Sequence, residues 1–264
     1  MRAVCTLAVV LIGMGWCSKA CLADEPERRP GWRAGADIFF GISNLAGPTR
    51  RITDRPWAAV ETYEPSVVYA EWAGESGDDL RLSLGVGDNY IGSDRSTRQP
   101  VECWWRRPIG TASLTLGKHW TPFAAQEWEY ETRWGAMVEA EVGSSSLALS
   151  LTHNEDTRAA NAVARIGHEV ADGVEFGLSV AAGRGWSYAT SHSKGLGLDA
   201  RAEVGNIILT AEGLAAEGPN GRFTFGFLKT MVKAAKGWRP YAGAYYGHDT
   251  TDEQGEIRSV ALGV

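Results

Sequence analysis

Few residues of this chain have the types and spacing that catalysis or metal binding requires. The five histidines are dispersed, without the spacing of metal ligands: His119, His153, His168, His192 and His248. Ser150 lies near His153 and Asn154 in the sequence, which could serve hydrolysis, but no complete set of nucleophile, base and orienting group can be named. His248-Asp249 could at most bind a cation in a loop. We therefore expect no catalytic residue, no metal and no cofactor.

The first residues of the chain have the layout of a secretory signal peptide. Arg2 provides the positive start, the run 4–15 is apolar, and small residues at Cys21 and Ala23 offer a cleavage site before Asp24. The apolar run is too short for a membrane anchor of ~20 residues. We predict a signal peptide over 1–23, followed by a single domain over 24–264.

Cysteine usage excludes a disulfide-stapled domain. Three of the four cysteines, Cys5, Cys17 and Cys21, fall in the predicted signal peptide, so the processed chain keeps only Cys103. A single thiol cannot form an internal disulfide. We interpret Cys103 as a small apolar strand residue.

Charge and hydropathy narrow the class of protein further. The formal net charge is −6, and an acidic balance argues against a nucleic-acid partner. Mean hydropathy is −0.21, and no stretch of the processed chain is long and apolar enough for a membrane-spanning helix. Strands that cross a membrane need only ~9–11 residues and alternate apolar with polar. The 32 glycines and 11 tryptophans suit that class.

Alternation with a period of two is the dominant pattern. In 79–88, Leu80, Leu82 and Leu84 share one face, while Arg81 and Ser83 share the other. Similar rows recur along the chain, one of them with Phe223, Phe225 and Phe227 as its apolar positions. The polar face is rich in Gly, Ser and Thr, unlike the face that a soluble sheet turns to water. We therefore predict that the apolar rows face lipid and the small and charged rows face an enclosed interior.

Fourteen strands can be placed, with 12 or 16 as alternatives: 31–42, 64–73, 79–88, 101–106, 110–119, 133–142, 146–153, 159–169, 173–183, 194–204, 206–214, 221–232, 237–247 and 256–264. Short and long connections alternate between them. An even strand number with short turns at one end and longer loops at the other is typical of a bacterial outer-membrane barrel. The prediction is an all-β, antiparallel, up-and-down transmembrane barrel.

Aromatic residues gather near the predicted strand ends. Indole and phenol rings favour the boundary between membrane and water. We expect an aromatic girdle that includes Trp32, Trp72, Trp134, Trp186, Trp238 and Tyr246.

Residues 110–123, with the sequence GTASLTLGKHWTPF, resemble a segment of the general porins of Gram-negative bacteria. In that family the segment leads into a loop that folds inward and narrows the pore. The resemblance implies a constriction loop over 120–132 that carries Glu127, Glu129 and Glu131, opposite a basic wall. It also implies an outer-membrane location, the barrel assembly machinery as a partner, and a homotrimer. The chain departs from the family in its smaller strand number and in ending on Val264 rather than phenylalanine.

The face opposite the apolar rows supplies the predicted pore wall. Its marker residues are Arg81, Arg165, Arg201, Glu139, Glu141 and Asp199. Over all predicted strands this face carries nine acids (Asp37, Glu71, Glu139, Glu141, Glu169, Glu175, Asp199, Glu203, Glu212) against four bases (Arg33, Arg81, Arg165, Arg201), which favours cations mildly. The predicted function is a passive, porin-like channel for small hydrophilic solutes. A structural or surface-binding barrel and a barrel hydrolase remain as alternatives.

Overall fold

All regular structure in the described residues is β-strand. The computed structural model describes residues 7–12, 30–37, 39–42, 67–85, 100–125, 132–154, 158–186, 193–219, 221–234, 240–250 and 255–263. Within these ranges no helix is long and apolar enough to cross a membrane.

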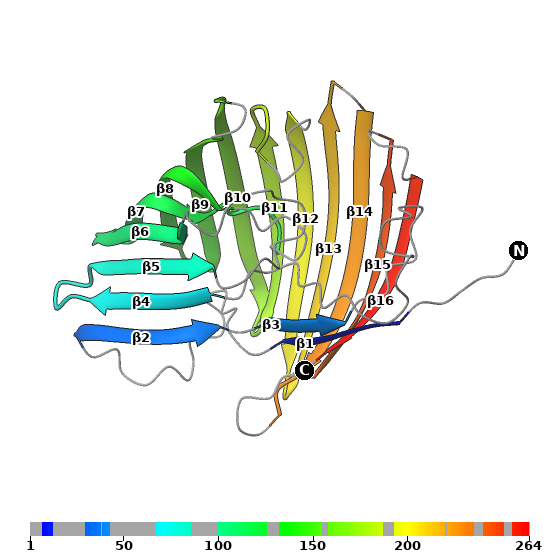
Figure 1. Cartoon of the computed structure of the whole chain (residues 1–264), viewed down its shortest axis with the longest axis horizontal. Helices are drawn as coiled ribbons and strands as arrows, with labels where there is room; N and C mark the ends of the chain where they lie inside the picture. Colours follow the sequence, from blue (N-terminus) through cyan, green and yellow to red (C-terminus); the bar gives the residue numbers. More distant parts are fainter. Residues whose placement is uncertain are drawn as a thin grey trace, which may run out of the picture.

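Fourteen of the described strands form one antiparallel, up-and-down sheet in which their order follows the chain (Figure 1). The sheet runs through β2 (Gly31–Asp37), β4 (Val67–Ala73), β5 (Asp79–Gly85), β6 (Pro100–Ile109), β7 (Ala112–Trp120), β8 (Thr132–Val142), β9 (Ser145–His153), β10 (Ala160–Ala171), β11 (Val174–Ala182), β12 (Lys194–Val204), β13 (Ile207–Gly218), β14 (Gly221–Val232), β15 (Tyr241–Asp249) and β16 (Gly255–Gly263). These fourteen strands confirm the predicted number and topology.

Two further strands complete the sheet beyond β16. β1 (Leu7–Ile12) pairs in parallel with β16, and β3 (Phe39–Ile42) pairs antiparallel with β1. The sequence analysis did not predict β1, which lies within the segment expected to be a signal peptide. The described residues form an open sheet, because β2 and β3 occupy its two opposite edges.

Tight turns join the strands at one end of the sheet. Two residues connect β8 to β9, β10 to β11, and β12 to β13. Gly143 and Gly205 begin two of these turns with φ of 61° and 58°, values that glycine adopts without steric cost and that match the twist of paired strands. The opposite end carries the longer connections 43–66, 86–99 and 121–131, although only 219–220 joins β13 to β14 there.

One face of the sheet is apolar and exposed. In β9, Leu147, Leu149 and Leu151 are 42%, 48% and 57% exposed, whereas Ser150 between them is fully buried. Leu198 in β12 is 59% exposed. A soluble sandwich would bury such rows between two sheets. We call this the outer face and the opposite one the inner face.

The prediction that the apolar row of β14 faces lipid was wrong. Phe223, Phe225 and Phe227 are 1%, 4% and 5% exposed on the inner face, while Leu228 is 57% exposed on the outer face. Thr224 and Gly226 accompany Leu228 outward. The alternation of β14 is real, but apolar rings on one side of a strand do not reveal which medium that side meets. Here they join an apolar cluster on the inner face.

Candidate functional site

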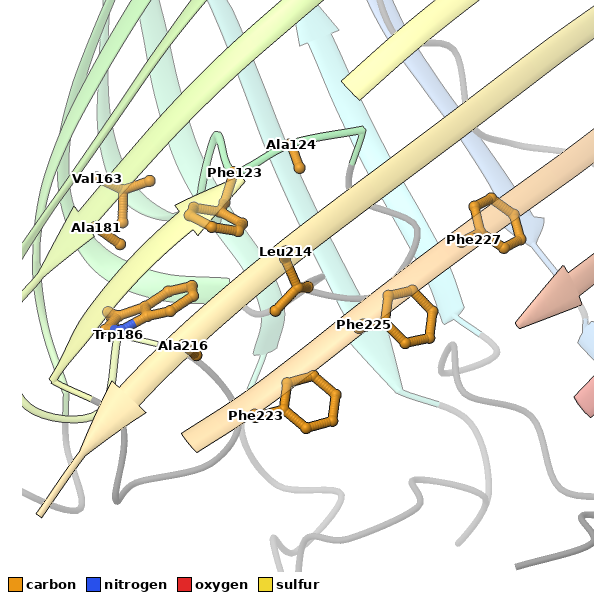
Figure 2. Packing of buried hydrophobic residues seen from close by; sticks show 10 residues of the cluster. All are labelled: Phe123, Ala124, Val163, Ala181, Trp186, Leu214, Ala216, Phe223, Phe225 and Phe227. Atoms are coloured by element: carbon orange, nitrogen blue, oxygen red, sulfur yellow. The ribbon is translucent and has the colours of Figure 1, made fainter. Parts of the chain in front are cut away.

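The inner face is divided into two zones. The half nearer the longer connections carries a cluster of buried apolar residues, shown in Figure 2: Phe123, Ala124, Val163, Ala181, Trp186, Leu214, Ala216, Phe223, Phe225 and Phe227. The half nearer the tight turns carries a belt of ion pairs formed by Arg33, Glu71, Arg81, Glu102, Arg106, Glu139, Arg165, Glu175, Asp199, Arg201, Glu203 and Lys233.

The segment after β7 folds against the inner face. Phe123 is fully buried and Ala124 is 4% exposed. The backbone N–H of Ala124 donates a hydrogen bond of 2.8 Å to Oγ of Ser179, 55 residues further along the chain in β11. The described start of the predicted constriction loop 120–132 therefore crosses to the opposite wall. Glu127, Glu129 and Glu131 lie outside the described residues.

Two glycines of β12 receive the aromatic rings of this cluster. A Cβ atom built on Gly197 would lie 3.0 Å from the ring of Phe123, and one built on Gly195 would lie 2.2 Å from the ring of Trp186. The two rings lie against each other with centroids 4.6 Å apart and planes tilted by 41°. Missing side chains at two successive inner positions thus create the space into which Phe123 and Trp186 pack.

Trp186 is held in place by the connection on which it lies. The carbonyl oxygen of Gly185 accepts a hydrogen bond of 2.6 Å from Nδ2 of Asn154 and one of 3.4 Å from Nδ2 of Asn161. Asn154 is itself fully buried. The expectation that Trp186 belongs to the aromatic girdle does not fit this position, because its ring is 1% exposed and packs on the inner face.

The three phenylalanines of β14 form a row along the inner face (Figure 2). Their ring centroids are 6.3 Å apart between Phe223 and Phe225 and 6.5 Å apart between Phe225 and Phe227, in near-parallel planes. Further toward the tight turns, Lys229 lies over the ring of Tyr241 at 5.0 Å. The row therefore passes from apolar to charged along one strand.

The first part of the belt links four neighbouring strands. Nε of Arg33 in β2 lies 2.7 Å from Glu71 in β4, and Glu71 also pairs with Arg81 in β5. Nε of Arg81 donates a hydrogen bond of 2.7 Å to Glu102 in β6. The guanidinium of Arg81 also lies 4.5 Å from the ring centre of Tyr69. Cations and carboxylates thus alternate from strand to strand.

The belt continues through a second pair. Nη2 of Arg106 in β6 donates a hydrogen bond of 2.6 Å to Glu139 in β8, and its Nε donates one of 3.2 Å to Oγ1 of Thr115 in β7. One side chain therefore ties three strands together.

The last part of the belt lies on β10, β11 and β12 and includes Lys233, just beyond β14. Arg165 donates hydrogen bonds of 2.6 and 3.2 Å to both oxygens of Asp199 and one of 2.8 Å to Glu175. Glu203 pairs with Arg201 and, at 2.7 Å, with Nζ of Lys233. Bidentate contacts of this kind fix geometry as well as charge.

Several predicted wall residues thus meet on one belt. Arg81, Arg165, Arg201, Glu139 and Asp199 belong to it, whereas Glu141 shares their face but is exposed near a turn. The sequence analysis missed six charged residues. Five lie on the inner face, and the sixth, Lys233, pairs with Glu203 of that face. The six are Asp79, Glu102, Arg106, Arg133, Lys229 and Lys233. The belt itself holds six bases and six acids, so its formal charge is zero.

Ser150 pairs with His119 rather than with His153. Nδ1 of His119 lies 3.0 Å from the carbonyl oxygen of Gly117, so Nδ1–H donates and Nε2 accepts from Oγ of Ser150 at 2.9 Å. This resembles the hydrogen bond that activates a serine. However, Ser150 is fully buried and His119 is 2% exposed. The pair fits a bond between β7 and β9 that satisfies two buried groups.

Substitution Ser150→Ala is expected to cost about 1–3 kcal/mol of unfolding free energy, because it leaves the buried Nε2 of His119 without its donor. Ser144→Ala, in the exposed turn after β8, should change the stability little. Urea unfolding in detergent micelles measures both. A smaller loss for Ser150→Ala than for Ser144→Ala would contradict this account.

The aromatic residues expected at the membrane boundary differ in their exposure. Trp32, Trp134 and Tyr246 are 72%, 37% and 48% exposed on the outer face. Trp72 is half-buried and pairs with Trp32 across β2 and β4. Trp238 lies outside the described residues. The girdle remains a prediction.

Among the described residues, no group of three or more His, Cys, Asp or Glu side chains could hold a metal ion.

Comparison with known proteins gave matches only among solved structures. No protein-family model matches the chain. No curated protein matches it either. The similar structures are outer-membrane porins and channels.

Three of these structures show the range of similarity. A loop-deletion mutant of OmpT, an outer-membrane protein of Vibrio cholerae, is 12% identical, with 87% of this chain and 95% of that chain covered and a TM-score of 0.47. The channel DcaP of Acinetobacter baumannii is 8% identical, with coverage of 75% and 83% and a TM-score of 0.47. An anion-selective porin from Comamonas acidovorans is 9% identical, with coverage of 89% and 93% and a TM-score of 0.45. These values do not assign the chain to a family.

Proposed function

We propose that the chain is a passive channel of the outer membrane of a Gram-negative-type bacterium, for small hydrophilic solutes. The observation that carries this proposal is the contrast between the two faces of one sheet. Rows of leucine, valine and isoleucine are exposed on the outer face, while ion pairs and hydroxyl groups lie on the inner face. Exposed apolar surface of this extent suits contact with lipid. A curled wall with polar groups inside suits water.

The proposed partners follow from the same arrangement. Outer-membrane lipid would contact the outer face, and insertion would depend on the barrel assembly machinery. A homotrimer and removal of residues 1–23 on export also belong to the proposal.

The inward segment would set the width of the pathway. Because Phe123 and Trp186 fill the inner face over β11–β14, solutes would pass beside this apolar zone and along the belt of ion pairs. The width that remains beside this zone would therefore limit the size of the solutes that pass.

Charge selectivity is proposed to be weak. The structure adds Asp79 and Glu102 to the predicted acids and adds Arg106, Arg133, Lys229 and Lys233 to the predicted bases, whereas the side chain of Asp37 lies outside the described part of the chain. Ten acids then stand against eight bases, so only a small preference for cations is left. Rings of charged side chains that line a pore favour the entry of ions of opposite sign.

Reconstitution in a planar bilayer tests the function directly. We expect stepwise single-channel currents and a reversal potential that is slightly cation-selective under a salt gradient. Heat-modifiable migration on a gel should accompany them. A folded, heat-modifiable protein without conductance would instead favour a structural barrel whose lumen is filled.

Arg165→Gln is expected to shift the reversal potential toward stronger cation selectivity, because it leaves Asp199 and Glu175 uncompensated. It should also cost about 2 kcal/mol of stability, less than the ~3–5 kcal/mol of a fully buried pair, since water reaches the belt. Arg222→Gln is the matched control, because the Arg222 side chain is 77% exposed and 4.0 Å from Glu217. Equal shifts in both variants would argue against a pathway along the belt.

A further inference from the structure

Two connections that lie far apart in the sequence meet on the inner face of β12. One is the described part of the inward segment, residues 121–125, which follows β7. The other is segment 183–186, which follows β11 and includes Trp186. The rings of Phe123 and Trp186 lie side by side, with 4.6 Å between their centroids (Figure 2). The two connections therefore share one apolar contact.

The second connection is held by hydrogen bonds that do not involve the inward segment. The carbonyl oxygen of Gly185 accepts from Nδ2 of Asn154, directly after β9, and from Nδ2 of Asn161 in β10. The backbone N–H of Gly183 donates a hydrogen bond of 3.0 Å to the carbonyl oxygen of Ser193, directly before β12. The wall therefore fixes this connection whether or not the inward segment is docked.

The ring of Trp186 occupies a place on β12 that only a glycine leaves open. A Cβ atom built on Gly195 would lie 2.2 Å from Cζ2 of Trp186. Atoms without a bond between them do not approach so closely, so any side chain at this position must displace the indole. Glycine in the interior of a strand weakens the strand, and its presence often marks the close approach of another group.

The position of Phe123, by contrast, depends on Trp186. The ring of Phe123 contacts the wall at Gly197, where a Cβ atom would lie 3.0 Å from it, and it contacts the indole of Trp186. Both rings are buried, at 0% and 1% exposed. Loss of the indole would uncover one side of Phe123 and remove the van der Waals partners on that side.

We propose that Trp186 is the positioning residue of the inward segment: segment 183–186 fixes the indole on β12, and the indole holds Phe123 against the wall. The dependence runs in one direction. Loss of Trp186 releases the inward segment, whereas loss of Phe123 leaves segment 183–186 in place. The connection after β11 therefore controls the width of the pathway, and this effect on width rests on the proposed channel.

Two proteases report on the two connections separately. A protease specific for glutamate cuts at Glu127, Glu129 and Glu131, which follow directly on the inward segment. Trypsin cuts after Arg184, which is exposed. When local opening and closing are fast, cleavage of a folded protein tracks the population of the opened state. The full chain is digested in its folded form in detergent, and mass spectrometry identifies the cut sites.

Trp186→Ala should speed cleavage at the three glutamates by about tenfold or more, because the buried ring that covers Phe123 is gone. Gly195→Ala should act in the same direction, since its methyl group displaces the indole. Trp186→Phe keeps an aromatic ring and should stay closer to the wild type than Trp186→Ala. Phe123→Ala should speed cleavage at the glutamates but leave cleavage after Arg184 at the wild-type rate.

Gly226→Ala is the matched control for Gly195→Ala. Gly226 lies in the interior of β14, and a Cβ atom there would meet no heavy atom within 4 Å. This variant should leave both cleavage rates unchanged. Heat-modifiable migration on a gel reports whether each variant folds, and Gly195→Ala decides the question where Trp186→Ala does not fold.

The outcomes separate this inference from the proposed function. Wild-type cleavage at the glutamates in folded Trp186→Ala and Gly195→Ala would overturn the inference. Faster cleavage after Arg184 in Phe123→Ala would overturn the one-way dependence and with it the role of Trp186. In bilayers the released segment should give larger and noisier currents. The expected cleavage pattern in a protein without conductance would refute the channel and leave the positioning role standing.

Discussion

Leu198→Arg is expected to destabilise the membrane-inserted protein by about 2–4 kcal/mol, the cost of a cation on the lipid-facing side of a barrel strand near the middle of the bilayer. Leu198 lies near the centre of β12 and is 59% exposed on the outer face. Urea titration of folding into lipid vesicles, followed by tryptophan fluorescence, measures the effect. Because the side chain is already exposed, no loss of packing accounts for a change of this size.

Val204→Arg is the matched control for this prediction. Val204 is the last residue of β12 and is 66% exposed on the same sheet. Near the membrane boundary the same change costs only about 0–1 kcal/mol. A soluble protein would tolerate arginine equally at both exposed sites. Equal effects in the two variants would therefore exclude lipid contact at β12.

Phe123→Ala is expected to release the inward segment from the wall. Removing a buried phenylalanine typically costs about 3–5 kcal/mol, which shifts the docking equilibrium by roughly two to four powers of ten. The hydrogen bond from Ala124 to Ser179 alone adds only about 1 kcal/mol and cannot hold the segment. In bilayers the variant should show larger and noisier single-channel currents than the wild type, and the segment should be cleaved faster by a protease.

Phe176→Ala provides the comparison for Phe123→Ala. Phe176 has the same side chain, but it is 53% exposed on the outer face of β11. Its replacement should leave the conductance unchanged. An unchanged conductance in Phe123→Ala, with normal folding, would show that the segment does not narrow the pathway.

Strand positions could be predicted from the sequence because alternation is a local property. The predicted strand 194–204 matches β12 to the residue, and 221–232 matches β14. The face of the sheet on which a side chain lies depends less on the local sequence. Leu147, Leu149 and Leu151 face outward, but the phenylalanines of β14 face inward because Phe123 and Trp186 cover that part of the wall. The residues that cover the wall lie on connections between strands, and hydrophobic patterns do not predict where those connections pack.

The charges that were missed have the same origin. Lys229 shares the face of Phe225 and Phe227, so the wrong facing of β14 removed it from the predicted wall. Arg106 lies in a stretch with adjacent tryptophans and arginines, 104–107, where no alternation can be read. Lys233 lies just beyond β14, and its contact with Glu203 depends on tertiary structure.

The inward segment was foreseen only through a family resemblance, but the sequence carries a signal of its own. Gly195 and Gly197 alternate with Leu196 and Leu198, so two successive inner positions of one strand lack side chains. Buried glycines at such spacing indicate that another group approaches the wall closely. Which group approaches, here Phe123 and Trp186, is decided by connections distant in sequence.

The paired charges of the belt also make an incorrect register between strands unfavourable. A hairpin that slips by one residue reverses the facing of every side chain on it. For β4 and β5 such a slip would turn Glu71 and Arg81 outward into hydrocarbon and Leu80 and Leu82 into water. Since Arg33, Arg81 and Arg165 contact carboxylates on neighbouring strands, one slipped hairpin would also leave the charges of the adjacent strands without their partners. A shifted register is thereby penalised strand by strand while the sheet forms.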